Sequence, residues 1–90
     1  GIEFTKIDEN ISIFPNPSKG EFRIQFSDTW KGEIDLEIID IFGRPIYDDK
    51  LNNNDGSSSH EVDISSSNDG LYLIQLIQGE KKAMFKLVKE

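Results

Sequence analysis

The chain has 90 residues, a net charge of −7 and no cysteine. This length suits one domain with a single apolar core. The acidic balance argues against nucleic-acid binding, which depends on neutralising phosphates, and the lack of cysteine excludes disulfides, thiolate metal ligands and a thiol nucleophile. No apolar run approaches the roughly 20 residues of a membrane-spanning helix, so we expect no membrane insertion.

The first residue is Gly1 and no signal-peptide pattern follows it. We therefore expect a C-terminal piece of a longer protein whose export signal lies upstream. In this interpretation residues 1–9 are a linker from an upstream cargo domain, and residues 10–90 form the folded domain.

Segments along the whole chain alternate apolar and polar residues with a period of two, which is the pattern of half-buried β-strands. The segment 71–78 differs because it is apolar on both faces, as expected of a central strand. The expected strands are 11–14, 21–26, 33–42, 44–50, 60–64, 71–78 and 81–89. The side chains expected to face the core include Phe22, Ile24, Phe26, Ile34, Leu36, Ile38, Val62, Ile64, Ala83, Phe85 and Leu87. Short strands separated by turn residues indicate an all-β fold, either a sandwich or a small barrel.

The first connection holds Asn16 between Pro15 and Pro17. Proline fixes φ, has no N–H to donate, and keeps the residue before it extended. The strand from Ile11 must therefore end here, and Ser18-Lys19-Gly20 turns the chain into the next strand. We expect a stiff corner at the edge of the sheet, but these rules give no reason for the particular order Pro-Asn-Pro.

The other connections carry turn chemistry. Gly32, Gly43 and Gly70 each stand where a turn needs a positive φ, which glycine adopts without a Cβ clash. Residues 52–59, with the sequence NNNDGSSS, are expected to form a polar loop of low complexity.

We find no constellation that supports catalysis. A triad of Ser57, His60 and Asp63 crowds three residues into one loop and strand start, with no oxyanion hole, so His60 is better explained as an exposed loop histidine. Asp48 and Asp49 point to opposite faces of a strand and make a poor acid–base pair. We expect neither enzymatic activity nor a cofactor.

The acidic loop could in principle form a calcium-binding site. Aligning Gly56 with the invariant glycine of an EF-hand places Leu51 and Val62 where carboxylates are required, so that match fails. A looser site through Asp55 or Asp69 stays open. Asn10-Ile11-Ser12 also fits the short glycosylation pattern, which three residues match often by chance.

Two aromatic residues raise a second class of function. Trp30 and Tyr47 are candidate stacking residues for a sugar, as in carbohydrate-binding β-sandwiches. The simpler explanation of a lone tryptophan beside a turn is that it closes the open end of the core.

Four segments, in order, carry a family resemblance: ISIFPNPSKGEFRI, IIDIFGRPIY, VDISSSNDGLYLIQL and KKAMFKLVKE. Together they resemble the type A C-terminal sorting domain of the type IX secretion system of Gram-negative bacteria. The resemblance covers residues 10–90. One departure is SSSNDG before Leu71, where many relatives carry a short segment with proline.

The resemblance implies a seven-stranded, Ig-like antiparallel β-sandwich that serves as a secretion signal. It implies recognition by the outer-membrane translocon, removal by a sortase that cuts upstream of the domain, and attachment of the cargo to lipopolysaccharide at the cell surface. The cargo then passes through the periplasm and is secreted or held at the outer-membrane surface. The residues that match the family's motifs are Pro15, Asn16, Pro17, Gly20, Asp40, Gly43, Gly70, Tyr72, Lys82, Lys86, Leu87 and Val88.

The last ten residues hold four lysines and one glutamate, whereas residues 1–80 hold 6 basic and 16 acidic residues. Such lysines protect an edge strand against aggregation. Alternatively, the terminal strand presents free backbone groups that pair with a strand of a receptor. Two rivals to the sorting signal remain: a carbohydrate-binding sandwich and a plain structural spacer in a secreted protein.

Overall fold

The computed structural model describes residues 10–55 and 58–90, so the proposed linker lies outside the described residues. Within these residues, all regular structure is β apart from one turn of 3-10 helix, η1 (Asp28–Trp30). The strands are β1 (Ile11–Phe14), β2 (Glu21–Phe26), β3 (Gly32–Asp40), β4 (Pro45–Asn53), β5 (Ser59–Asp63), β6 (Gly70–Gln78) and β7 (Lys81–Lys89). The seven expected strands are confirmed, with shifts at several ends.

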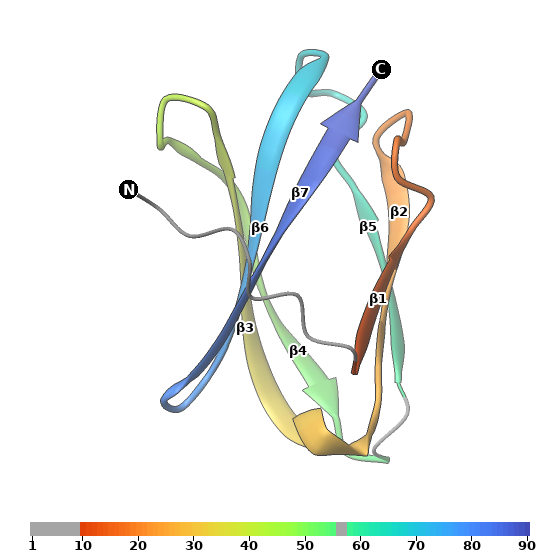
Figure 1. Ribbon diagram of the computed structural model, residues 1–90, viewed down its shortest axis with the longest axis vertical. Coiled ribbons are helices and arrows are strands. Elements are labelled where there is room, and N and C mark those ends of the chain that lie inside the picture. Colours follow the sequence, from red (N-terminus) through yellow and green to blue (C-terminus); the bar gives the residue numbers. More distant parts are fainter. Residues whose placement is uncertain (1–9, 56–57) are drawn as a thin grey trace.

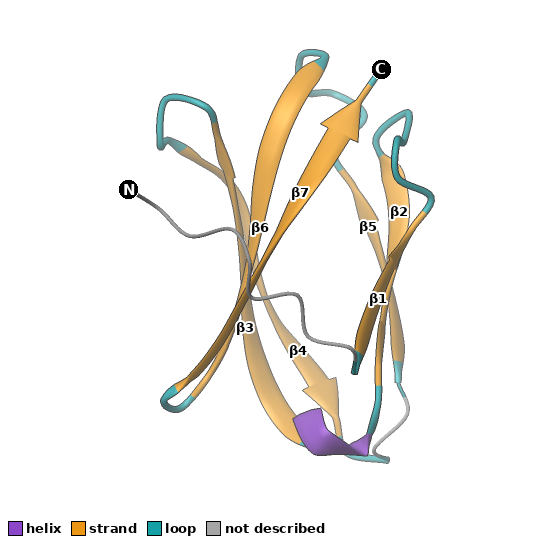
Figure 2. Cartoon of the chain, in the orientation of Figure 1, coloured by secondary structure: helices purple, strands orange, loops and turns teal. Residues whose placement is uncertain are grey.

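The strands form two antiparallel sheets that face each other (Figure 1). One sheet has the order β1-β2-β5, and the other has the order β4-β3-β6-β7. The chain therefore crosses between the sheets after β2, after β4 and again after β5. This arrangement is a sandwich, which settles the choice left open between sandwich and barrel. Loops collect at the two ends of the strands (Figure 2).

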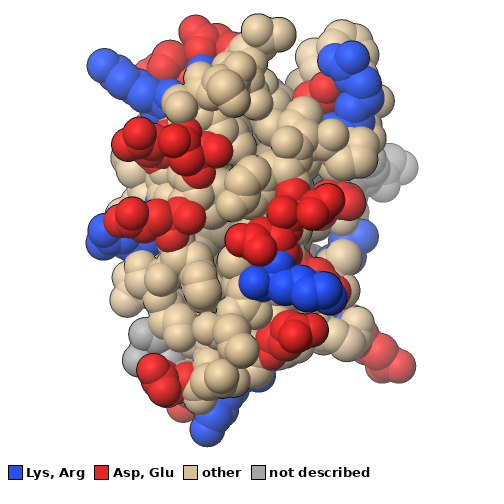
Figure 3. All heavy atoms as spheres, turned by 180° about the vertical axis from the view of Figure 1, so that it is seen from behind, with Lys and Arg blue, Asp and Glu red and all other residues tan. Residues whose placement is uncertain are grey.

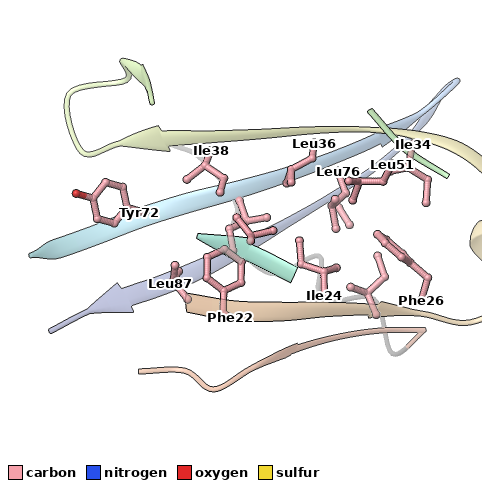
Figure 4. Packing of buried hydrophobic residues seen from close by; sticks show 14 of the residues in the cluster. Phe22, Ile24, Phe26, Ile34, Leu36, Ile38, Leu51, Tyr72, Leu76 and Leu87 are labelled. Atoms are coloured by element: carbon pink, nitrogen blue, oxygen red, sulfur yellow. The ribbon is translucent and has the colours of Figure 1, made fainter. Parts of the chain in front are cut away.

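The core lies between the sheets and is made by the inward half of each alternating strand. Phe22, Ile24 and Phe26 from β2 point toward Ile34, Leu36 and Ile38 from β3 (Figure 4), and all six are buried. From β7, Ala83 and Leu87 are buried as expected, and Phe85 is half-buried against the same cluster. The period-two pattern thus predicts the inward faces correctly.

Trp30 closes the core at the end of the sandwich where η1 lies. Its side chain is fully buried, and Lys81 Nζ stands 4.6 Å from the centre of its ring. The backbone O of Trp30 accepts a hydrogen bond of 3.0 Å from Asn53 Nδ2. A fully buried ring offers no face to a sugar, so the structural explanation of Trp30 is confirmed and the stacking platform is wrong.

The polar loop is shorter than expected because β4 continues to Asn53. Asn53 is fully buried and satisfied: Nδ2 donates to the backbone O atoms of Ser27 and Trp30, and Oδ1 accepts from Ser58 N. A buried amide with all of these partners is stabilising, whereas an unpaired one costs free energy. This asparagine therefore belongs to the core and not to a loop.

Candidate recognition surface

The residues that carry the family resemblance gather at one end of the sandwich. They lie in the β1–β2 connection, the β3–β4 turn, the start of β6 and the end of β7, which Figure 1 shows beside the C-terminus. The strand register joins these segments, since Asp40 pairs with Tyr72 and Gly70 pairs with Lys89. We call residues 15–20, 40–44, 65–72 and 86–90 the C-terminal end. Lys82 alone lies far from it, opposite Ile77 on β6.

Asn16 binds the terminal strand with its side chain. Its Nδ2 donates to the O atom of Lys86 at 2.7 Å, and its Oδ1 accepts from the N atom of Val88 at 3.1 Å. A primary amide offers one donor and one acceptor side by side, as the backbone of a neighbouring strand does. The side chain of Asn16 therefore takes the place of a short piece of an additional strand.

Ser18 continues this pairing with its backbone. Its N donates to Val88 O and its O accepts from Glu90 N, both at 2.8 Å, in a parallel bridge opposite Lys89. The Ser18 side chain is buried, where Oγ donates to Glu21 O and accepts from Gly20 N. Asn16 and Ser18 together cover the β7 edge from residue 86 to residue 90.

These contacts answer the question raised by Pro-Asn-Pro. Pro15 and Pro17 have no N–H, so neither can add to the β1 ladder, and both are exposed on either side of Asn16, whose amide contacts the edge of β7. The peptide bonds Phe14–Pro15 and Asn16–Pro17 are both cis. The expected corner is present between β1 and β2, and in it Asn16 and Ser18 contact the last strand.

One expectation for the terminal strand needs correction. β7 is an edge strand, as expected, but its last residues are not free to pair with a receptor strand because Asn16 and Ser18 already bind them. The lysines of this strand lie toward both of its ends. Lys81 donates to Thr29 O at the opposite end, and Lys89 is 7% exposed with its Nζ 2.8 Å from Asp69 Oδ1.

Gly20 makes the closest approach in this corner. It has a φ of +113°, and a Cβ placed on it would stand 2.6 Å from Ser65 Cα and 2.9 Å from Lys89 Cε. Its O accepts a 2.8 Å hydrogen bond from Ile64 N, which ties the β1–β2 connection to the end of β5. Only glycine fits this position, because any side chain enters the backbone of Ser65.

Asp40 organises the turn between β3 and β4. Its Oδ1 accepts from Phe42 N at 2.9 Å and from Arg44 N at 3.0 Å, and its Oδ2 accepts from Arg44 Nε at 2.8 Å. Partial burial raises the pKa of the Asp40 carboxyl, but the hydrogen bonds from Arg44 and Phe42 outweigh it and the net pKa is lowered. The charged form therefore stabilises the turn above the usual Asp pKa, and this contribution is lost as the pH falls through the lowered value.

Gly43 completes this turn with a φ of +80°, as predicted, and its N donates to Asp40 O at 3.0 Å. The turn begins earlier than expected, since β3 ends at Asp40 instead of continuing to Phe42. Ile41 and Phe42 are consequently at the tip of the turn, with exposed fractions of 67% and 76%. The sequence pattern predicts a strand at these two large apolar residues, whereas the structure places them in the turn.

Tyr72 sits at the start of β6, two residues after Gly70, whose φ is +149°. The ring is 6% exposed and belongs to the core. Its hydroxyl donates a hydrogen bond back to the O atom of Asn68, in the connection from β5. Tyr72 therefore fixes this connection to the core, opposite fully buried Leu87 on β7.

Replacing Asn16 with alanine is expected to lower the free energy of unfolding by about 1–2 kcal/mol, since two hydrogen bonds are lost at a solvent-exposed site. Urea unfolding of the purified domain measures this change. Asn16→Asp is a matched control, because it keeps the acceptor for Val88 N but places a carboxylate oxygen beside Lys86 O. An alanine variant as stable as the wild type would show that the amide contributes nothing to the corner.

The polar residues considered for chemistry are not brought together. His60 lies in β5, half-buried with its ring edge-to-face against Phe26 at 6.1 Å, so the expectation of a loop histidine is wrong. No hydrogen bond between His60 and Asp63 is present in the described part of the chain. Asp63 instead accepts from Ser65 N and Ser65's hydrogen bonds lower its pKa. Ser57 and Gly56 lie outside the described residues.

A shallow hollow of about 510 Å³ lies over the outer face of the three-stranded sheet, between Phe14, Pro15, Arg23 and Glu61. Arg23 and Glu61 form an ion pair of 3.0 Å across it. Among residues 10–55 and 58–90 there is no group of three or more His, Cys, Asp or Glu side chains placed to hold a metal. None of the helical structure described is long and apolar enough to span a membrane.

A comparison with family models matches residues 12–90 to the family described as the secretion system C-terminal sorting domain. A comparison with curated proteins found no significant match. The matched region includes the whole C-terminal end, from the Pro-Asn-Pro corner to the last strand. The chain belongs to the family of C-terminal sorting domains of the type IX secretion system.

Proposed function

We propose that the C-terminal end of this sorting domain is the surface that the type IX outer-membrane translocon recognises. The domain acts as a sorting signal for a cargo exported across the outer membrane. The observation that supports the proposal is the convergence of the motif residues: Asn16 and Lys86 are 70 residues apart in sequence, yet their atoms are joined by a 2.7 Å hydrogen bond. A signal read by another protein needs such a rigid, composite surface and no active site.

We further propose that the sandwich is Ig-like. The sheet orders β1-β2-β5 and β4-β3-β6-β7 support this assignment. The hydrogen bond from the Tyr72 hydroxyl to Asn68 O supports it too, because Ig-like sandwiches commonly have a tyrosine near the start of the sixth strand that bonds back to the preceding corner.

The proposed sorting function also includes the fate of the cargo. We propose that residues 1–9 link the domain to its cargo, that a sortase removes the domain, and that the cargo is attached to lipopolysaccharide.

The experiment that tests the sorting function is a fusion of residues 1–90 to a fluorescent protein directed to the periplasm. We expect surface or medium fluorescence in cells with a working type IX translocon and retention in the periplasm in cells without one. A plain structural spacer gives retention in both strains. Equal distribution of the fusion in the two strains would contradict the proposal.

The Lys86→Ala variant distinguishes an effect on recognition from an effect on folding. Its side chain is exposed near the end of β7, so Lys86→Ala should change the free energy of unfolding by no more than about 0.5 kcal/mol. If recognition uses this charge, the same variant lowers export of the fusion while the melting temperature stays unchanged. Lys31→Ala is the matched control, since Lys31 is an exposed lysine beside η1, at the other end of the sandwich.

A further inference from the structure

Among residues 10–55 and 58–90, four of the five exposed large apolar side chains lie at the C-terminal end. Ile41 is 67% exposed, Phe42 76%, and Leu71 and Val88 39% each. Leu71 and Val88 are register partners, and Ile41 directly follows Asp40, which pairs with Tyr72. We call these four residues the apolar corner; they lie at the C-terminal end, on the side of the four-stranded sheet. Large exposed apolar side chains that lie near one another mark interaction sites in soluble proteins.

The tip of the apolar corner is held in place before any partner arrives. The Asp40 carboxylate accepts from Phe42 N and Arg44 N, and two backbone hydrogen bonds of 3.0 Å, Gly43 N to Asp40 O and Asp40 N to Arg44 O, close the turn. Phe42 and Ile41 therefore cannot fold back onto the core. An apolar side chain on a fixed turn loses little conformational freedom on binding, which favours its use as an anchor.

Positive charges flank the apolar corner in a protein whose net charge is −7. The Arg44 guanidinium lies 5.1 Å from the centre of the Phe42 ring and uses Nε for Asp40, while its side chain stays 71% exposed. Lys86 is exposed two residues before Val88. Acidic groups are spread over the molecule, as the reverse view in Figure 3 shows, and Asp69 and Glu90 lie at the C-terminal end, where Asp69 pairs with Lys89. A matching surface therefore combines an apolar pocket with carboxylates at its rim.

We propose that the apolar corner docks into a concave apolar pocket, rimmed by carboxylates, on a protein of the export machinery, with Phe42 as the main anchor. This inference rests on the proposed sorting function. A lipid surface fits less well, because an acidic domain is repelled by the anionic headgroups that attract peripheral proteins. The acidic side chains of the partner meet Arg44 and Lys86, while its pocket removes Phe42 and Ile41 from water.

The test compares export of the periplasmic fusion with its Ile41→Ser/Phe42→Ser variant. Both side chains are exposed, so the melting temperature of the purified variant should stay within about 4 °C of the wild type. Export should nevertheless fall by about tenfold or more, as expected when a side chain that is buried in the interface with a partner is lost. Phe14→Ser is the matched control: Phe14 is 41% exposed on the other sheet, and its loss should leave export unchanged.

A second measurement keeps the inference testable if the double variant folds poorly. A photo-reactive phenylalanine analogue replaces Phe42 in one fusion and Phe14 in another. We expect a covalent adduct with a translocon component from position 42 only, and we expect excess purified wild-type domain, but not the Phe42→Ser domain, to suppress it. Equal adducts from both positions, or no competition, would overturn the inference.

The outcomes separate the inference from the function on which it rests. If the wild-type fusion is not exported, the sorting function itself fails. If the wild type is exported and the folded double variant is exported equally well, the function stands and the docking surface is wrong. Binding of the purified wild-type domain, but not the Phe42→Ser domain, to vesicles of phosphatidylethanolamine and phosphatidylglycerol would assign the corner to a membrane and overturn the proposal.

Discussion

Replacing Tyr72 with alanine should lower the free energy of unfolding by about 3–5 kcal/mol, the usual cost of removing a large buried aromatic ring. The ring is 6% exposed and its hydroxyl binds Asn68 O, so the variant loses both core packing and the anchor of the β5–β6 connection. A small domain has a total stability of roughly 5–15 kcal/mol. The loss is therefore expected to leave a large share of the protein unfolded at physiological temperature.

Urea and thermal unfolding of the purified domain measure this effect. Tyr72→Phe is the informative companion, because it keeps the ring and removes only the hydrogen bond, at an expected cost of about 1 kcal/mol. A Tyr72→Ala variant that unfolds at the wild-type urea concentration would show that the core does not depend on this ring.

Gly20→Ala should be comparably damaging for a different reason. The new Cβ would stand 2.6 Å from Ser65 Cα and 2.8 Å from Ser65 N, atoms that cannot rotate away as the end of a side chain can. Backbone strain at a φ of +113° adds roughly 1–3 kcal/mol, and forced repacking a further 1–3 kcal/mol. We expect lower stability and a loosened contact between the β1–β2 connection and β7.

Gly79→Ala is the matched control for this prediction. Gly79 also has a positive φ, +61°, but a Cβ there has nothing within 4 Å among the described residues. It should therefore show only the cost of a left-handed conformation, about 1–2 kcal/mol. If the two alanine variants are equally stable, the approach of Ser65 to Gly20 has no energetic consequence.

Much of the fold follows from the alternation of apolar and polar residues. A half-buried strand needs one apolar face, so the pattern of EFRIQF fixes both the strand and the inward direction of Phe22, Ile24 and Phe26. The positive φ values predicted for Gly32, Gly43 and Gly70 are confirmed for the same local reason, since a tight turn asks for glycine within a few residues.

The strand ends were predicted less well, because hydrogen bonds of individual side chains decide them, one long-range and one local. Asparagine is common in loops, yet Asn53 is a buried strand residue because its side chain donates hydrogen bonds to the backbone O atoms of Ser27 and Trp30. Ile41 and Phe42 continue the apolar pattern of β3, yet the hydrogen bonds of Asp40 turn the chain before them. Local propensity is overridden at both places by bonds that the sequence does not display.

The C-terminal end itself was predicted as a set of residues but not as an arrangement. The family resemblance named Asn16 and Lys86 as motif positions but did not place them on one surface. No rule of local structure pairs a side-chain amide with a strand 70 residues away, and a serine between proline and lysine gives no sign that its backbone will bind Val88 and Glu90. The signal available beforehand was a polar residue, Asn16, fixed between two residues that cannot donate.

The pairing of Asn16 and Ser18 with residues 86–90 has a consequence for biosynthesis. The ribosome makes these last residues of the domain after all the others, so the corner has nothing to bind while translation is in progress. A chain that ends before Lys86 lacks the buried side chain of Leu87. It also lacks the backbone groups that form hydrogen bonds with Asn16 and Ser18. The surface that we propose for recognition is therefore complete only once translation has reached Glu90, and on this proposal a cargo chain that terminates earlier would not be exported.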